Sequence, residues 1–489
     1  MSMFNSAGVY PRIKDQSFLV SSSGLLTGAV VISSKRGPTE PTYVTSGTQF
    51  LSLYGTPSRV NPSMYAAIRF LNRAGSLTVV RATLDAVAAS GTLSTSNEAE
   101  TLLSFTAENG GAWGNKLTVE FAEIVGAKEG VFQLIVKEDG LTVETFEVSL
   151  DEDAKNGYGA NVYIEDVVNE GSTRIRVSDE SPNAIEGESV DLTATVTFTG
   201  GSDDTGAPDE ATIIAGYNAF QRLETEAQLL INAGWATPAV QTAMLNTAEI
   251  RKDAVAILDV PQDAAGDAQA MVDYRDELGA NTYFGGLYGG WIKAYDQYND
   301  RNIEVPASGD VAAVFVNTVE VGERWDAPAG LQRGVITNAL GTTLNMSEGE
   351  RDLLYVNGVN PVTSINGTSA VVWGQKTLQK EQSALSSANV VNLLLWANQR
   401  MSESLQPFVF EPNTQFTRDN VNSLLVAFLS NIKQRGGLYD FSVNTGTDIN
   451  TSQVIDSNAM LVDVYVQPVK TAEYIQMTLT VTRTGVSLS

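Results

Sequence analysis

Residues Leu25–Ser33 read Leu-Leu-Thr-Gly-Ala-Val-Val-Ile-Ser, a short run that is apolar at most positions and therefore predicts a β-strand. Two helical patterns follow it, one ending at Gly55 and the other at Gly75. The chain then returns to a strand pattern over Leu77–Ala82. This strand–helix–helix–strand order predicts the beginning of a layered α/β domain.

Both helices carry start signals. Ser46 and Gln49 have the spacing of a capping box. Pro62 stands at an expected first helical position after Asn61. Four apolar side chains then fall on one helical face, which predicts its packing on a core: Met64, Tyr65, Ile68 and Leu71.

A different texture begins near Ser90 and lasts to Asp204, because helical periods give way to short β-rich runs. Turn residues such as Asp139-Gly140 separate most of these runs. The pattern predicts an all-β domain, a sandwich or barrel, inserted into the α/β part. The predicted strands are Lys116–Ile124, Val131–Lys137, Thr142–Val148, Thr173–Val177 and Asp191–Thr199.

Alternating helices and strands resume after Ala207. Asp253–Pro261 predicts a buried strand, Ala264–Leu278 a helix and Tyr283–Leu287 a further short strand. Further apolar runs occur at Val311–Phe315 and Val371–Trp373.

The last hundred residues have the clearest periods. Apolar residues recur at helical spacing from Val390 to Leu405 and again from Val421 to Ile432, where Thr417 is a candidate cap. Strand alternation follows at Val462–Val466 and at Ile475–Val481. The sequence therefore predicts a C-terminal α/β domain with two long helices and a small sheet.

Composition restricts the chemistry open to this chain. Its 489 residues include no cysteine and no histidine, which excludes thiol nucleophiles, imidazole metal sites and any triad with a histidine base. The formal charge of −26 disfavours direct binding of nucleic acid. No apolar stretch is long enough to span a membrane, and residues 1–20 lack a secretory signal pattern. We therefore expect that the protein folds and is used in a cytoplasm, or is released from one by lysis.

Catalytic motifs are also scarce. The glycine-rich stretch Gly285–Gly290 lacks a lysine and a clear following helix, so a turn is favoured over a phosphate cradle. Asp259 ends an apolar strand, where a capping role is favoured over catalysis. Acidic clusters at Asp151–Asp153 and Asp203–Asp204 lack the spacing of a calcium loop. We predict no enzyme activity, no cofactor and no metal.

An alternating strand at the C-terminal end of the chain needs a sheet to join. It either closes the sheet of its own subunit or extends the sheet of a neighbour by β-augmentation.

Motifs in a fixed order then make the chain resemble contractile bacteriophage tail sheath proteins. Near the start, Ala7-Gly8-Val9-Tyr10 resembles the opening of that family, with Ala7 where proline is usual. Departures also occur at Lys376, where arginine is usual, and at Thr471, where proline is usual. The other matching motifs are Arg36-Gly37-Pro38, Pro41–Ser46, Phe50 with Tyr54-Gly55, Trp113-Gly114-Asn115, Pro306–Gly309, Ala327–Gly330, Asn357–Asn360, Trp373–Leu378, Phe410–Asn413 and Gln467–Ile475.

The resemblance implies a structural subunit that polymerises as stacked hexameric rings, wound helically around an inner tail tube. Contraction of such a sheath drives the tube through the host envelope. The implied partners are further copies of the chain, the tube protein, and baseplate and tail terminator proteins, without nucleic acid or membrane insertion. The implied location is the virion tail, with assembly in the host cytoplasm.

The resemblance also implies that terminal arms reach neighbouring subunits. We predict an N-terminal arm (1–20), a discontinuous α/β domain (21–90 and 205–375), an inserted β domain (91–204), a C-terminal domain nearest the tube (376–473) and a C-terminal arm (474–489). The predicted inter-subunit contacts are Val9, Tyr10, Phe18, Val20, Ile475, Met477, Leu479 and Val481. The alternatives are another virion protein, such as a tube or baseplate component, or an α/β enzyme that uses carboxylates.

Overall fold

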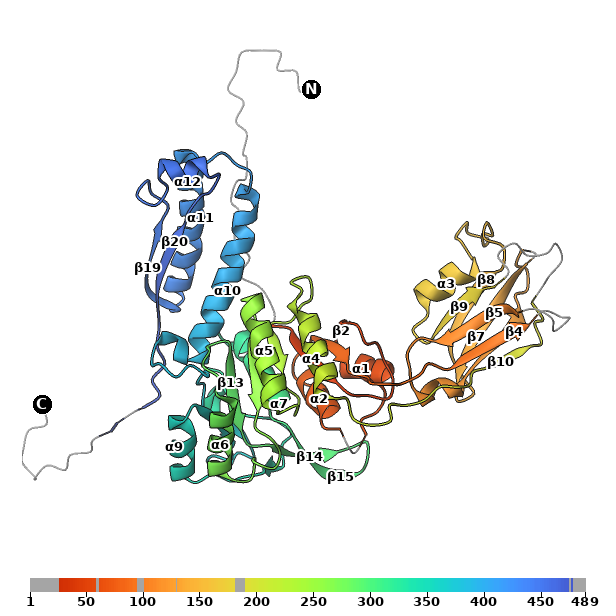
Figure 1. Cartoon of the computed structure of the whole chain (residues 1–489), viewed down its shortest axis with the longest axis horizontal. Coiled ribbons are helices and arrows are strands. Elements are labelled where there is room, and N and C mark those ends of the chain that lie inside the picture. Colours follow the sequence, from red (N-terminus) through yellow and green to blue (C-terminus); the bar gives the residue numbers. More distant parts are fainter. Residues whose placement is uncertain are drawn as a thin grey trace, which may run out of the picture. The chain divides into compact units, whose positions relative to one another are not determined.

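The computed structural model describes residues 26–58, 61–94, 101–128, 130–180, 190–474, 476 and 477. The chain divides into two compact units, one over Leu25–Val391 and one that includes Asn392–Ser489 (Figure 1). The first unit carries the large sheet and the β-rich segment, and the second carries the last helices and strands. The α/β class predicted from the sequence is confirmed, whereas the exact domain limits remain a prediction.

A mixed sheet forms the centre of the first unit. Its inner strands run parallel, and an antiparallel strand closes each edge. Among the described residues its spatial order is β18 (Val371–Val372), β17 (Val359–Thr363), β13 (Gly285–Gly289), β12 (Val255–Asp259), β11 (Leu229–Ile231), β1 (Gly28–Ile32), β3 (Leu77–Arg81) and β2 (Thr42–Val44).

Helices cover both faces of this sheet, which explains why its strands are apolar without alternation. In β1, Val30 and Ile32 join the core beneath α2 and α7, whereas Val31 touches α4 on the opposite face, close to Gly216. Figure 1 shows α4 and α5 side by side in this second layer. The helices are α1 (Gly47–Tyr54), α2 (Ser63–Leu71), α4 (Glu210–Asn218), α5 (Pro238–Arg251), α6 (Ala268–Leu278), α7 (Ser308–Val321), α8 (Gly330–Arg333) and α9 (Glu348–Val356).

The predicted helix starts need two corrections. The Ser46 hydroxyl accepts from Gln49 N at 3.2 Å, but the Gln49 side chain accepts from Thr45 N, so only half of the expected capping box forms. Pro62 lies one position before α2, and the Asn61 carboxamide accepts from the first helical N–H at 3.0 Å. Asn61 is therefore the residue that satisfies this helix end.

The glycine-rich stretch is a buried strand, β13, which overlaps the strand predicted over Tyr283–Leu287. The turn predicted for Gly285–Gly290 was wrong over most of its length. All five residues of β13 are buried between β12 and β17. A Cβ on Gly285 would lie 2.5 Å from Leu245 Cδ2 and 3.0 Å from Ala256 O. Glycine is required here because helix α5 approaches the sheet closely, not because the chain turns.

A small antiparallel sheet, the β14–β15–β16 sheet, lies between β13 and β17 in the sequence. It consists of β14 (Ile292–Asp296), β15 (Arg301–Val305) and β16 (Gly341–Thr342). Asp296 at the end of β14 is buried and accepts from the Tyr65 hydroxyl at 2.7 Å, which ties this sheet to α2.

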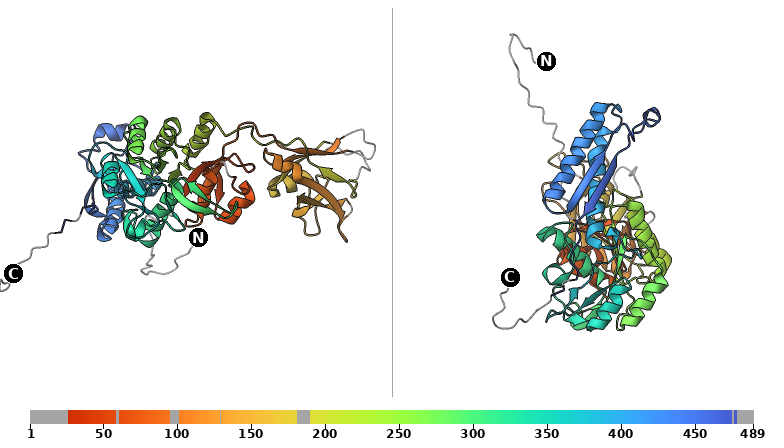
Figure 2. Two further views of the ribbon diagram at one scale, coloured as in Figure 1. Left: turned by 90° about the horizontal axis from the view of Figure 1, so that it is seen from below. Right: turned by 90° about the vertical axis from the view of Figure 1, so that its left-hand side faces the viewer.

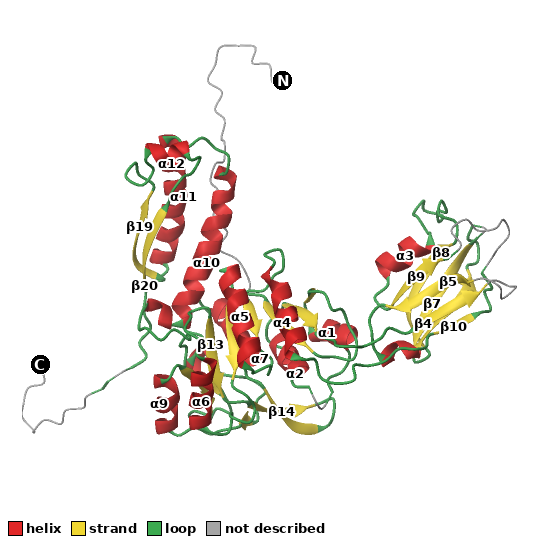
Figure 3. Cartoon of the chain, viewed as in Figure 1, coloured by secondary structure: helices red, strands yellow, loops and turns green. Residues whose placement is uncertain are grey.

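The β-rich segment contains two antiparallel sheets around one apolar core (Figure 3). It also contains helix α3 (Ile164–Gly171), which the sequence interpretation missed; Ile164 and Val168 bury one side of it at helical spacing. One sheet has the order β10 (Thr195–Thr197), β6 (Leu117–Glu123), β7 (Val131–Glu138), β8 (Leu141–Ser149), and the other β4 (Ser90–Ser94), β5 (Thr101–Ala107), β9 (Ile175–Asp179).

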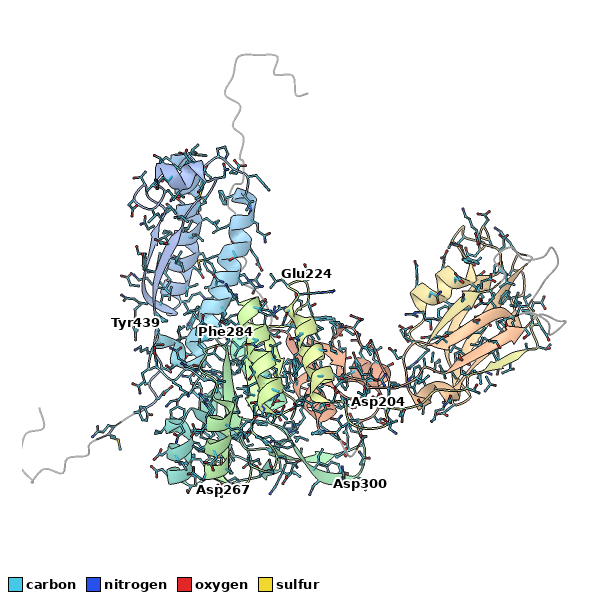
Figure 4. The ribbon with its side chains drawn as sticks, viewed as in Figure 1. Asp204, Glu224, Asp267, Phe284, Asp300 and Tyr439 are labelled. Atoms are coloured by element: carbon cyan, nitrogen blue, oxygen red, sulfur yellow. The ribbon has the colours of Figure 1, made fainter. Side chains whose placement is uncertain are left out.

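Two peptide segments connect this β-rich segment to the rest of its unit, and they pair through Val87 and Ser202. Asp204, labelled in Figure 4, accepts hydrogen bonds from three consecutive backbone N–H groups, those of residues 84–86, at 2.8–2.9 Å. Asp203 accepts from Ala112 N at 2.8 Å. The carboxylates of Asp203 and Asp204 therefore accept backbone N–H groups rather than face a cation.

Candidate assembly surface

The second unit is built on two long helices. Helix α10 (Ala388–Leu405) leads into it, and α11 (Gln415–Gln434) follows after a loop. Thr414, rather than the predicted Thr417, is the N-cap of α11: its hydroxyl accepts from Thr417 N at 3.3 Å. Thr417 lies inside the first turn and donates its hydroxyl to Pro412 O at 2.7 Å.

One face of α11 is buried, as its apolar spacing predicted. Phe428 packs against Trp396 of α10 with ring centroids 5.5 Å apart. The other buried apolar residues of this face are Val421, Leu425, Leu429 and Ile432. This packing fixes α11 against α10, and the strands that follow pack on α11.

A two-stranded antiparallel hairpin lies against α11 (Figure 2, right). It consists of β19 (Leu438–Asn444) and β20 (Asp463–Pro468), in a register that pairs Phe441 with Val466 and Val443 with Val464. The sequence interpretation found β20 but missed β19. A bulge between Leu438 and Asp440 interrupts the alternation there, so the period-2 signal is lost.

This hairpin is an incomplete sheet. Among the described residues, no further strand pairs with the outer edge of β19 or of β20. The paired apolar residues Phe441, Val443, Val464 and Val466 are only half-buried. A two-stranded sheet is marginally stable in water, and its free N–H and C=O groups are a template for further strands.

The solvent side of the hairpin is aromatic. Tyr439, labelled in Figure 4, is 62% exposed and Tyr465 is 63% exposed. Lys433 donates to Asp440 at 2.8 Å, and this hydrogen bond lowers the pKa of the Asp440 carboxyl. The hairpin therefore combines open main-chain groups with large side chains, the combination that strand addition uses.

The residues predicted to make inter-subunit contacts can be located only in part. Val9, Tyr10, Phe18 and Val20 lie outside the described residues, as do Ile475, Leu479 and Val481. Met477 is described: it belongs to no strand of its own chain, and it is 86% exposed. Its role in a contact remains a prediction.

Asp259, the carboxylate considered for catalysis, is part of a buried polar network. Its side chain accepts from Ser308 N at 2.8 Å and from Gly234 N at 3.1 Å, and it is 1% exposed. Burial raises the pKa of Asp259 to about 6, against the opposing effect of these hydrogen bonds. The neighbouring Asn232 carboxamide accepts from Asp259 N and from Gln241. This geometry joins the end of β12, the loop after β11 and the start of α7 at the carboxyl edge of the sheet.

Two further observations concern the part of the chain that the structure describes. No three acidic side chains there come together as ligands for a metal ion. No helix there combines the length and the apolar composition needed to cross a bilayer.

An α/β scaffold that ends in a β19–β20 hairpin whose outer edges no described strand covers is typical of a protein that assembles by strand addition. Residues 206–378 match the phage tail sheath protein central domain, and residues 380–482 match the phage tail sheath C-terminal domain. The chain belongs to the phage tail sheath family.

Curated relatives carry the same description. The tail sheath protein of Vibrio phage KVP40 is 30% identical over 381 residues, which cover 72% of this chain and 55% of the relative. The tail sheath protein of Enterobacteria phage T4 is 26% identical over 375 residues, covering 72% of this chain and 56% of the relative. The chain thus spans about half the length of the curated relatives that it matches.

Solved structures share the fold at low identity. A sheath tail protein from Listeria innocua superposes with a TM-score of 0.62 at 13% identity, covering 92% of this chain and 96% of that one. The helical sheath of the anti-feeding prophage in its contracted state has a TM-score of 0.59 at 15% identity, covering 98% and 99%.

Proposed function

We propose that this chain is the structural subunit of a contractile tail sheath. In this proposal, copies of the chain stack as hexameric rings in a helical array around an inner tail tube. Contraction of the array drives the tube through a host envelope. The chain itself catalyses no reaction, and the work comes from the difference in packing between two states of the lattice.

The open β19–β20 hairpin carries the proposal. A subunit that must stay connected to its neighbours while its globular parts move needs a contact that slides little and dissociates slowly. Strand addition meets this need, because main-chain hydrogen bonds along the full length of the strand supply the affinity. No described strand pairs with the outer edges of the hairpin, so each edge offers a place for an added strand.

The chain also contains the sequences that such strands require. Ile475, Met477, Leu479 and Val481 alternate with polar residues, so that one face of an added strand would be apolar. Val9 and Tyr10, with Phe18 and Val20, supply the apolar positions of the N-terminal arm. In the proposed array, these two arms of one subunit complete the hairpins of its neighbours.

The partners follow from the same proposal. They are further copies of the chain, an inner tube protein, a baseplate and a tail terminator. Support for the first and third comes from solved structures with this fold, a contracted helical sheath and a baseplate of the anti-feeding prophage. The proposed location is the virion tail, after assembly in the host cytoplasm.

Deletion of either arm tests the proposal. Chains lacking residues 1–16 or residues 474–489 should melt cooperatively as soluble monomers, and they should form no cylinders under negative-stain microscopy. Loss of the cooperative melt in the C-terminal deletion would place that strand in the core of its own subunit. Normal cylinders from both deletions would overturn the arm exchange, and the contacts would then lie on the globular units.

A further inference from the structure

The chain contains four Asn–Gly pairs, at residues 109–110, 156–157, 357–358 and 366–367. In such a pair the glycine has no side chain to hinder the approach of its backbone nitrogen to the carboxamide carbon of the asparagine. Attack at that carbon closes a five-membered ring and releases ammonia. Whether a pair reacts in the folded chain depends on how the glycine nitrogen and the carboxamide are held.

Two of the pairs are held in ways that oppose the attack. Gly358 N donates to Tyr355 O at 3.2 Å, so the attacking nitrogen is already engaged at the end of α9. Gly110 is enclosed by other backbone: Arg81 donates to Gly110 O at 2.8 Å, and a Cβ on Gly110 would overlap Ala86 O. The nitrogen of Gly110 therefore has no space in which to move toward the neighbouring side chain.

The pair at 156–157 is arranged differently. It lies in the loop between β8 and α3 (Figure 3), where Gly159 N donates to Asn156 O at 3.1 Å and closes a turn. Asn156 Oδ1 accepts from Tyr158 N and from Ala160 N, both at 3.0 Å. The bond from Tyr158 N folds the carboxamide over the Gly157 peptide, which brings Asn156 Cγ toward Gly157 N.

The same contacts favour the reaction electrostatically. Negative charge develops on Asn156 Oδ1 during the attack, and the two N–H donors that already point at this oxygen stabilise that charge. Gly157 is exposed, and among the described residues its N–H donates no hydrogen bond. Lys128 Nζ donates to Lys155 O at 2.9 Å, which places an ammonium group near the peptide that must lose a proton.

We infer that Asn156–Gly157 is a site of spontaneous deamidation in the folded chain. Gly157 N gives its proton to water and bonds to Asn156 Cγ, and the side-chain nitrogen leaves as ammonia. Water then opens the resulting succinimide at one of its two carbonyls, which yields aspartate or isoaspartate. Both products add a negative charge, and isoaspartate also inserts a carbon into the backbone of the turn. The inference is independent of the proposed sheath function.

The pair at 366–367 provides an internal control. Asn366 and Gly367 are both exposed, but the Asn366 carboxamide makes no hydrogen bond among the described residues. The full chain is incubated at mildly alkaline pH, and conversion at each pair is followed by peptide mapping with mass spectrometry. Asn156 should convert about tenfold faster than Asn366, the ratio expected from stronger hydrogen bonding to the developing charge. Equal rates, or faster conversion at Asn366, would overturn the inference.

Incubation in urea separates the effect of the turn from that of the neighbouring sequence. The unfolded chain keeps neither set of contacts, so the ratio between the two rates should fall to about one. A ratio that persisted in urea would assign the difference to the flanking residues, and the turn would have no part in it.

Gly157→Ala tests the identity of the attacking nitrogen. A Cβ on Gly157 meets no atom within 4 Å, so the turn accommodates the methyl group, which a thermal melt would check. The methyl group hinders ring closure, and conversion at Asn156 should become no faster than at Asn366, whose own rate should not change. Undiminished conversion at Asn156 in this variant would contradict the inference.

Discussion

Replacing Asp259 with asparagine should remove a pH dependence of stability that this one carboxyl creates. Burial raises the pKa of Asp259 from 3.8 to about 6 in the folded chain. The folded state therefore holds the proton more tightly than the unfolded state does. This group's contribution to stability is greatest below pH 3.8 and is lost as the pH rises through 6.

The magnitude follows from the same shift. A difference of about two pKa units corresponds to about 3 kcal/mol over the full titration. Between pH 5 and pH 8, about 1.4 kcal/mol of this difference is expressed. Asparagine keeps an oxygen that can accept from Ser308 N, so the variant preserves part of the network while losing the titration.

The assay is urea unfolding of the unmodified chain and of Asp259→Asn at pH 5, 6.5 and 8. The difference in unfolding free energy between the two proteins cancels the titration of all other groups. As the pH rises from 5 to 8, the unmodified chain should lose about 1.4 kcal/mol of unfolding free energy relative to Asp259→Asn. A shift in the opposite direction would show that the hydrogen bonds to Asp259 outweigh its burial, and the reasoning would be wrong.

Two further changes test the packing of the first unit. Gly285→Ala should lower the free energy of unfolding in a urea titration by about 1–3 kcal/mol, because its Cβ would overlap helix α5. Gly349→Ala, at an open position in α9, is the control and should be neutral or slightly stabilising. Asp310→Asn should cost about 3 kcal/mol, because it breaks a buried ion pair in which Arg69 Nε lies 2.6 Å from the carboxylate. Asp139→Asn, at an exposed pair, is the control and should leave the unfolding curve unchanged.

Sequence patterns predicted the α/β class because the deciding signals are local. The apolar run of β1 and the helical period of α11 each predict which faces are buried without knowledge of the rest of the fold. The apolar run at Val311–Phe315 is less informative, since it lies inside helix α7. A short apolar run does not distinguish a buried helix from a buried strand.

Other features depend on what lies opposite a residue. The glycines of Gly285–Gly290 give a turn signal, whereas the strand pattern predicted over Tyr283–Leu287 is the one that holds, in part, as β13. The close approach of α5 to Gly285, which explains why a glycine stands there, has no signal in the sequence. β19 was missed because its bulge shifts the alternation. Phe410, in the loop between α10 and α11, is fully exposed, and this exposure has no signal in its own sequence, because a phenylalanine between two helices is usually buried.

The candidate surface was predictable only from one side. The alternation at Ile475–Val481 predicts a strand but does not show which sheet it joins. The free edges of β19 and β20 become evident only once the pairing of all described strands is known.

Negative-stain microscopy of the purified, unmodified chain tests the central claim most directly. The chain should polymerise without any added enzyme, nucleotide or metal. The account predicts wide hollow cylinders whose end views show sixfold symmetry. A chain that stays monomeric at every concentration and salt condition, or that closes into small rings without stacking, would contradict it.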